Sequence, residues 1–178
     1  MAGPASPGKV RAVVGDDHPL FREGVVRALS SSGSVDVVGE ADDGSAALEL
    51  IKEHLPDVAL LDYRMPGMDG GQVAAAVRSQ GLPTRVLLIS AHDEPAIVYQ
   101  ALQQGATGFV LKDSTRSEIV RAVLATARRA ATWWHRRLSE ALPQSPSPGG
   151  TDGTRAERAR TRGAQPDCAW SKHSGDRG

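Results

Sequence analysis

The feature that most constrains the fold is the segment VALLDYRMPGMDG, which spans residues 58–70. Four apolar residues lead directly into Asp62, and the proline and glycines that follow cannot continue a strand. Asp62 is therefore predicted to lie where a buried strand meets a loop, which is where parallel α/β sheets place their functional residues. Taken alone, such an aspartate is equally consistent with the first residue of an ordinary turn.

Two further apolar runs end in charged residues in the same manner. The run KVRAVV leads through Gly15 to Asp16 and Asp17, and the run GFVL leads directly to Lys112. The carboxyl ends of parallel strands meet at one edge of a sheet, so these residues are expected to converge there with Asp62. This convergence favours a functional site over three unrelated turns.

Strand-like and helical segments alternate strictly from residue 9 to about residue 126. The expected strands cover residues 9–14, 35–39, 58–61, 85–89 and 108–111. The expected helices begin at Pro19, Gly44, Gly71 and Pro95, and a fifth follows Ser114 as its N-cap. The first helix is expected to bury a stripe formed by Leu20, Val25, Val26 and Leu29.

This alternation, without any hairpin signal, predicts a parallel sheet covered by helices on both faces. The expected fold class is α/β, with a flavodoxin-like, doubly wound, five-stranded parallel sheet in the strand order 2-1-3-4-5. Strands one and three are neighbours in this order. The acids that follow them are therefore expected to share one crevice.

Composition divides the 178 residues into one domain and two flanking segments. Residues 1–8 are a Pro/Gly/Ser-rich lead predicted to be disordered, residues 9–126 form the predicted domain, and residues 127–178 form a basic tail. Asp+Glu and Lys+Arg number 16 and 11 through Ala125, but 5 and 10 beyond it. The tail carries too few apolar residues to bury a core, so it is predicted to be disordered.

The sequence carries no membrane or secretion signal. No run of about 18 apolar residues is present, and the first residues contain no apolar stretch typical of a signal peptide. The single cysteine, Cys168, rules out an internal disulfide framework. A cytoplasmic location is therefore expected, with no membrane partner.

Four motifs together resemble the receiver domain of two-component response regulators. They are GDDHP, LLDYRMPGMDG, the pair Ser90-Ala91 and FVLKD, and they occur in the order and with the spacings of that family. The combination of GDDHPLFREGV with GATGFVLKD is most similar to the subfamily that carries a LuxR-type helix-turn-helix output domain. The resemblance covers about residues 9–125.

The resemblance implies a role for each residue of the expected site. Asp62 is the phospho-acceptor for a histidine kinase, and Ser90 and Lys112 contact the phosphoryl group. Asp16 and Asp17 hold Mg²⁺ together with Asp62 and the backbone carbonyl of Arg64. Phe109 matches the position of the aromatic switch. These roles imply control of transcription in the parent family.

Physical chemistry favours the same roles. Carboxylates packed at one edge raise each other's pKa unless a cation lies among them, and Mg²⁺ suits an oxygen site with few protein ligands. Phosphoryl transfer requires mainly positioning and charge stabilisation, which a lysine and a metal can supply. If phosphorylation draws Ser90 inward, Phe109 is expected to fill the vacated space. The face built from the fourth helix, the fifth strand and the fifth helix would then change.

Two histidines lie near the expected site, and neither is predicted to bind the metal. His18 follows the acidic pair, and His92 follows Ser90 by two residues. Both are interpreted as surface or capping residues rather than metal ligands.

The tail leaves two interpretations open. It is either a genuine basic segment that contacts nucleic acid or acidic partners non-specifically, or the product of frame slips. Shifted by one base from Ala156, and with suitable codons, the tail can encode LSEREREVLSLIARGLSTAEIA, which resembles the start of a LuxR-type DNA-binding domain. Residues 129–137 can yield the linker-like GGDVVAPS only in the other alternative frame, so two slips are required.

Other functions remain alternatives at this point. An aspartyl-phosphate phosphatase or phosphotransferase also uses an aspartate after a strand, but such enzymes usually carry a second acid two residues on, where this chain has Arg64. A dinucleotide-binding domain would need a glycine-rich loop after the first strand. An adaptor that is never phosphorylated is a further alternative. The preferred hypothesis is a response regulator that is not an enzyme, for which a homodimer is left open and sequence-specific DNA binding is not expected of this chain.

Overall fold

The computed structural model describes residues 8–128 and 133–134. The predicted disordered lead covers residues 1–8, and the predicted disordered or frame-slipped tail covers residues 127–178. Of these, only residues 8, 127, 128, 133 and 134 are described, and the rest of both predictions lies outside the described residues. None of the described helices is both long and apolar enough to cross a membrane.

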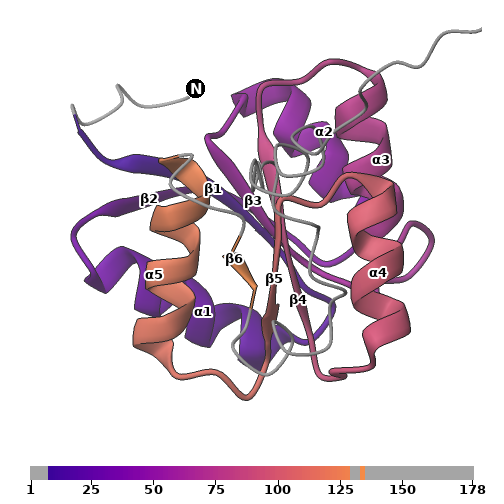
Figure 1. Cartoon of the computed structure of the whole chain (residues 1–178). Coiled ribbons are helices and arrows are strands. Elements are labelled where there is room, and N and C mark those ends of the chain that lie inside the picture. Colours follow the sequence, from indigo (N-terminus) through magenta and orange to yellow (C-terminus); the bar gives the residue numbers. More distant parts are fainter. Residues whose placement is uncertain (1–7, 129–132, 135–178) are drawn as a thin grey trace, which may run out of the picture. The chain divides into compact units, whose positions relative to one another are not determined.

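Five strands alternate with five helices in the described residues, and a short sixth strand follows. In chain order the elements are β1 Val10–Gly15, α1 Pro19–Ser31, β2 Val35–Ala41, α2 Gly44–His54, β3 Val58–Asp62, α3 Gly70–Ser79, β4 Arg85–Ser90, α4 Pro95–Gln104, β5 Gly108–Leu111, α5 Arg116–Ala127 and β6 Trp133–Trp134 (Figure 1). Each expected strand and helix is therefore present, with ends that differ by a few residues at most.

The sheet is parallel and confirms the predicted strand order. Its strands lie in the order β2-β1-β3-β4-β5-β6, so β1 and β3 are neighbours. The sequence did not predict β6, which extends the five-stranded sheet at the β5 edge. Trp133 pairs with Gly108 and Trp134 with Phe109.

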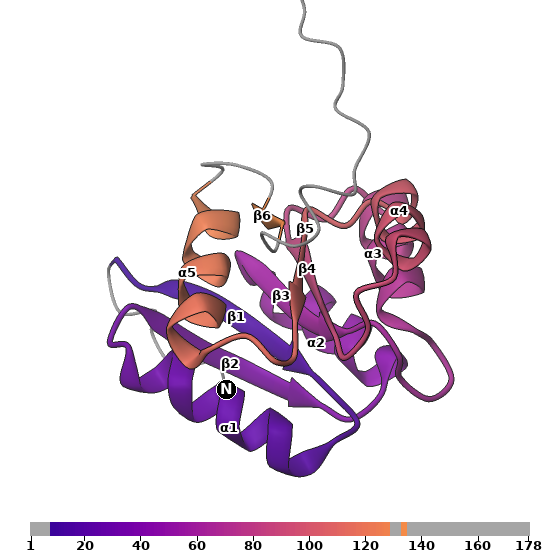
Figure 2. The same ribbon diagram turned by 60° about the horizontal axis from the view of Figure 1, so that its bottom comes forward.

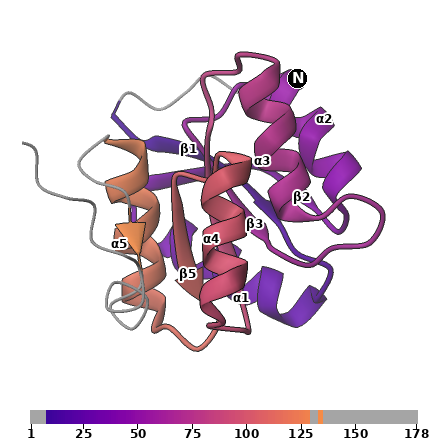
Figure 3. The same cartoon turned by 45° about the vertical axis from the view of Figure 1, so that its right-hand side comes forward.

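The two faces of the sheet each carry a hydrophobic core. Helices α1 and α5 cover one face, and α2, α3 and α4 cover the other (Figure 2). Figure 3 shows α3 and α4 side by side on this second face. Side chains of a strand alternate between its faces, so Ala59 and Leu61 pack toward α2–α4 while Val58 and Leu60 pack toward α1 and α5. Residues 58–62 are all buried, which explains why residues 58–61 read as an unbroken apolar run before Asp62.

Side-chain caps fix where several helices begin. Asp43 accepts a hydrogen bond from Ala46 N at the start of α2, and Asp69 and Gln72 form a capping box at the start of α3. The prediction that Ser114 caps α5 was wrong. Thr115 is the N-cap and forms a capping box with Glu118, because an acceptor three residues after the cap must reach back to its backbone N–H.

The predicted apolar stripe of α1 was wrong at one position. Val25 and Leu29 are buried, but Leu20 is 86% exposed. At 100° per residue, Leu20 lies about 140° around the helix from Val25, which turns it away from the sheet. Phe21, the next residue, packs against the α1 and α5 side of the core.

Candidate functional site

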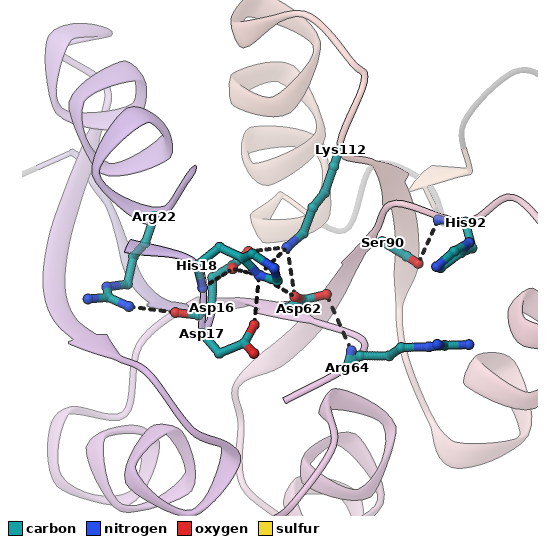
Figure 4. Close-up of polar contacts among 9 residues, drawn as sticks. All are labelled: Asp16, Asp17, His18, Arg22, Asp62, Arg64, Ser90, His92 and Lys112. Atoms are coloured by element: carbon teal, nitrogen blue, oxygen red, sulfur yellow. Dashed lines mark hydrogen bonds and ion pairs between the residues drawn. The ribbon is translucent and has the colours of Figure 1, made fainter. Parts of the chain in front are cut away.

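Four polar side chains meet at the carboxyl ends of β1 and β3 (Figure 4). They are Asp16, Asp17, His18 and Asp62, and one ligand atom from each lies within 4.8 Å of the others. Asp62 is the last residue of β3, and Asp16 directly follows β1, where its N–H donates to Ala41 O on β2. The predicted convergence of the strand-end acids is therefore what the structure contains.

The turn after β1 is held by the acids themselves. Asp16 is buried, and its Oδ1 accepts a hydrogen bond from His18 N at 2.8 Å. The guanidinium of Arg22, in α1, donates to Asp16 O at 2.6 Å and lies 3.6 Å from Glu40 Oε2. Asp16 is thus fixed through both its side chain and its backbone.

Lys112 links the two strand ends. It follows β5, and its Nζ donates to Asp62 Oδ2 at 2.7 Å and lies 2.8 Å from Asp16 Oδ2. The contact with Asp16 has the distance of an ion pair but lacks hydrogen-bond geometry. The lysine predicted from the FVLKD motif therefore lies between two of the predicted acids.

Burial and charge act in opposite directions on these groups. Burial raises the pKa of Asp62 above its ordinary value, and the nearby Asp16 charge adds to this effect. Lys112 lowers the pKa through its hydrogen bond and its charge, but the pKa stays raised overall. Burial alone would lower the pKa of Lys112, but its ion pairs with Asp16 and Asp62 raise the pKa overall. The site therefore holds its lysine charged while its phospho-acceptor candidate is costly to ionise.

The acidic cluster has the donor atoms that a hard cation requires. Asp16 Oδ2 and Asp17 Oδ1 are buried and accept no hydrogen bond within the described part of the chain. Carboxylate oxygens are preferred ligands of Mg²⁺, which also retains several waters, and the Asp17 carboxylate is partly open to solvent. The donor set therefore fits Mg²⁺. At Arg64 the observed contact is its N–H, which donates to Asp62 Oδ1 at 3.3 Å, so the role of its carbonyl stays a prediction.

Ser90 and Phe109 lie beside the cluster but do not bond to it. Ser90 is the last residue of β4 and is buried, and its Oγ accepts a hydrogen bond from His92 N at 3.0 Å. No hydrogen bond joins Ser90 to Asp62 among residues 8–128. Phe109 is fully buried in the core that faces α2–α4. Phe109, the predicted aromatic switch residue, thus already lies inside the core. Its role as a switch stays a prediction.

The sequence did not predict that the side chain of His18 contacts the acidic pair. Its side chain is 68% exposed, as expected for a surface residue, and it makes no capping hydrogen bond although it occupies the N-cap of α1. Its Nδ1 nevertheless lies 2.8 Å from Asp17 Oδ1 and 3.2 Å from Asp16 Oδ1. The sequence signal was its position directly after the acidic pair.

The loop after β3 requires glycine at defined points. Gly67 has a φ of +71°, in the left-handed region that other residues rarely adopt. A Cβ on Gly70 would collide with the carbonyl oxygen of Asp62, and the N–H of Gly70 donates to Tyr63 O. The MPGMDG motif therefore folds the loop back against the phospho-acceptor candidate.

Comparison with known families and proteins gives consistent matches. A family model described as the response regulator receiver domain matches residues 12–124. A transcriptional regulatory protein named NarL, from Mycobacterium tuberculosis strain H37Rv, is 84% identical over 128 residues, which are 72% of this chain and 59% of that protein. The nitrate/nitrite response regulator protein NarL of Escherichia coli K12 is 37% identical over 108 residues, 61% of this chain and 50% of that protein. The chain thus spans little more than half the length of these relatives.

Solved structures agree with these matches. The signal receiver domain of NarL from Mycobacterium tuberculosis has a TM-score of 0.68 and 87% identity, covering 68% of this chain and 98% of that one. A two-component response regulator of the LuxR family from Aurantimonas sp. SI85-9A1 has a TM-score of 0.70 and 30% identity, covering 74% and 94%.

Proposed function

This chain belongs to the response regulator receiver family, and from that membership we propose that it accepts a phosphoryl group on Asp62 from a histidine kinase. It is a two-component receiver of the NarL/LuxR group. Phosphorylation, Mg²⁺ binding and control of transcription are the further content of the proposal.

The observation that carries the proposal is the arrangement of charges around one buried carboxylate. Asp62 lies at a strand end between Lys112, at 2.7 Å, and an acidic pair whose buried oxygens Asp16 Oδ2 and Asp17 Oδ1 have only ion-pair contacts, with Lys112 and His18 at 2.8 Å. A carboxylate held by a single lysine and adjoining a cation site is what phosphoryl transfer to an aspartate requires. An acid that merely starts a turn has no need of either neighbour.

The chemistry follows from these positions. A carboxylate oxygen of Asp62 attacks phosphorus, the new P–O bond forms as the P–N bond of the kinase phosphohistidine breaks, and the imidazole leaves with the electron pair. Lys112 stabilises the charge on the transferred group. Bound Mg²⁺, held by Asp16, Asp17 and Asp62, would neutralise further charge on the phosphoryl oxygens.

The product changes the local hydrogen bonds. A phosphorylated side chain carries roughly −1.5 to −2 charges and three strong acceptor oxygens. The Ser90 Oγ now accepts a hydrogen bond from His92 N, and its hydroxyl O–H can donate to one of these oxygens. Movement of Ser90 and repacking around Phe109 then alter the face formed by α4, β5 and α5.

The relatives suggest the wider context. Proteins named as transcriptional regulators and response regulators match about half of their length to this chain, so control of transcription is proposed for the parent protein rather than for these residues. A cytoplasmic location and a homodimer belong to the same proposal. Of these residues we expect no enzymatic turnover beyond their own phosphorylation and dephosphorylation.

The test is labelling by a small phosphodonor in the presence of Mg²⁺. Wild type is expected to take up one acid-stable, base-labile phosphoryl group, and Asp62→Asn is expected to take up none. The matched control is Asp42→Asn, which alters an exposed acid that follows β2 at the same edge of the sheet. Equal labelling of wild type and Asp62→Asn would exclude Asp62 as the acceptor, whereas loss of label in Asp42→Asn would indicate a general charge effect.

A further inference from the structure

An aromatic ring from α1 lies against the site lysine. The Nζ of Lys112 lies 4.8 Å from the centroid of the Phe21 ring. We propose that Phe21 is a positioning residue that holds Lys112 toward Asp62 and thereby speeds phosphorylation. This inference rests on the proposed phospho-acceptor function.

The position of Phe21 is built into the turn after β1. Asp16 Oδ1 binds His18 N and closes the turn, and Pro19 then starts α1 with its φ already suited to a helix. Phe21 is the third residue of this helix and packs against the core beneath α1 and α5. The ring is therefore anchored by the same turn that carries Asp16 and Asp17, whereas Lys112 directly follows β5, much later in the chain.

The two acids contact the Lys112 ammonium from one side, and the Phe21 ring contacts it from another. A lysine side chain has four rotatable methylene links and a charge that water solvates well. Its Nζ is bonded on one side to Asp62 and paired with Asp16, and 14% of the side chain remains exposed. The Phe21 ring lies across another side, where it offers the negative face of its π system and excludes alternative positions of the ammonium.

Hydrophobic burial alone does not explain the ring. Phe21 is only partly buried, and the preceding Leu20 is exposed to solvent. An aliphatic side chain would serve the core equally well but has no π face for the ammonium. The two explanations therefore predict different behaviour for Phe21→Leu and Phe21→Trp.

The effect on Mg²⁺ separates positioning from disruption of the acids. Lys112 and a cation compete for the oxygens of Asp16 and Asp62, since both neutralise the same charge. A loosened lysine should therefore leave Mg²⁺ affinity unchanged or raise it. A distorted acidic turn would lower that affinity.

The experiment first measures the contact itself in the unphosphorylated protein. The Phe21 ring current should shift the NMR signals of the Lys112 ε-methylene protons upfield, and Phe21→Leu should abolish the shift. This measurement stands whether or not the protein is phosphorylated. A Lys112 signal at its ordinary position in wild type would overturn the proposal.

Phosphorylation rates then test the consequence. At saturating Mg²⁺, Phe21→Leu should slow labelling by a small phosphodonor about three- to tenfold, as expected for loss of a partly buried cation–π contact. Phe21→Trp should stay near wild type, and in a Lys112→Ala background Phe21→Leu should have no further effect. Val26→Ala, a partly buried change elsewhere on α1, controls for lost packing.

Each outcome decides between the explanations. Wild-type rates in Phe21→Leu would overturn the proposal, as would equal slowing in the Leu and Trp variants with weaker Mg²⁺ binding. If wild type takes up no label, the phospho-acceptor function itself fails, and the NMR shift still reports whether the ring contacts the lysine.

Discussion

The carboxylate of Asp62 is buried beside a second acid, and this burial makes stability depend on pH. Because its pKa is raised above 3.8 by burial, the folded state binds more protons than the unfolded state between 3.8 and the raised value. Stability from this group is therefore lost as pH rises through that interval. Lys112 acts in the same sense at high pH, since its pKa is also raised and the stability that it contributes is lost as pH rises above 10.5.

Removal of the Asp62 charge should therefore stabilise the metal-free domain. Without Mg²⁺, Asp62→Asn is expected to have a higher free energy of unfolding than wild type at neutral pH. The difference should shrink as pH falls toward 3.8, because Asp62 becomes protonated in the folded state over this interval. Urea unfolding in the presence of a chelator, between pH 4 and pH 7.5, measures it. A less stable Asp62→Asn at neutral pH would show that the pairing with Lys112 outweighs burial.

The second acid of the pair should report on the metal. Asp17 lies in the acidic cluster with Asp16 and Asp62, so Asp17→Asn is expected to weaken Mg²⁺ binding by roughly tenfold or more and to slow phosphorylation. The fold should survive, because the change relieves repulsion between carboxylates. Mg²⁺ titration followed by calorimetry measures the affinity. Unchanged Mg²⁺ affinity in both Asp16→Asn and Asp17→Asn would indicate that the two acids are turn residues and not metal ligands.

Helix α2 ends in a conformation that its sequence disfavours. Leu55, its C-cap, has a φ of +43°, in the left-handed region that usually takes glycine, and Pro56 prevents the helix from continuing. Leu55→Gly and Leu55→Ala lose the same side-chain contacts, but only the alanine keeps the strain. The glycine variant should therefore be more stable by about 1 kcal/mol.

The comparison has a control within the same helix. Glu53 is exposed inside α2, where Gly is less favourable than Ala by roughly 1 kcal/mol. Chemical denaturation of the four variants should give opposite signs at positions 53 and 55. The same sign at both positions would mean that the end of α2 is not held in the left-handed conformation.

Sequence patterns predicted the elements well where one physical cause dominates. Residues 58–61 of β3 are buried and apolar, so hydrophobicity was enough to predict this strand. Gly105 ends α4 with a φ of +100°, so a glycine was enough to predict the end of this helix. The acidic cluster was predictable for a similar reason. Strand ends of a parallel sheet share one edge, and hence the spacing of Asp16, Asp62 and Lys112 along the chain was enough.

Features that depend on contacts between distant segments were not predictable. The choice of Thr115 over Ser114 depends on the reach of Glu118, and the exposure of Leu20 depends on which side of α1 meets the sheet. The contact of Phe21 with Lys112 joins α1 to β5 and has no local signature. Strand β6 likewise depends on the open edge of β5, which only the assembled sheet provides.

At the scale of the whole chain, charge is divided unevenly. Residues through Ala125 carry an excess of acids, and the residues beyond carry an excess of basic side chains. The acidic part contains the site, while the basic part is suited to non-specific attraction toward phosphates. Nucleic-acid binding by this polypeptide would therefore come from the basic part and be electrostatic in character.

Sequence-specific DNA recognition is not expected from these residues. A helix-turn-helix needs a packed core that presents a recognition helix to the major groove, and the sequence of residues 127–178 has neither the apolar periodicity nor the length for one. Binding to two unrelated duplexes of equal length should be weak, equal for both and steeply reduced between about 50 and 200 mM salt. Phosphorylation of Asp62 should not change the preference.

Fluorescence anisotropy measures the affinity for both duplexes at each salt concentration. Selection from a random DNA pool is the stricter test of sequence preference. Enrichment of one motif by this polypeptide would contradict the prediction. Resequencing the coding DNA beyond residue 126 tests whether a frame slip produced the tail. A downstream frame that continues into a helix-turn-helix would identify the tail as a frame slip, and the repaired protein should then acquire a sequence preference. A confirmed frame without such codons would mean that the basic tail is genuine, and its salt-sensitive attraction to phosphates would then be a property of the native protein.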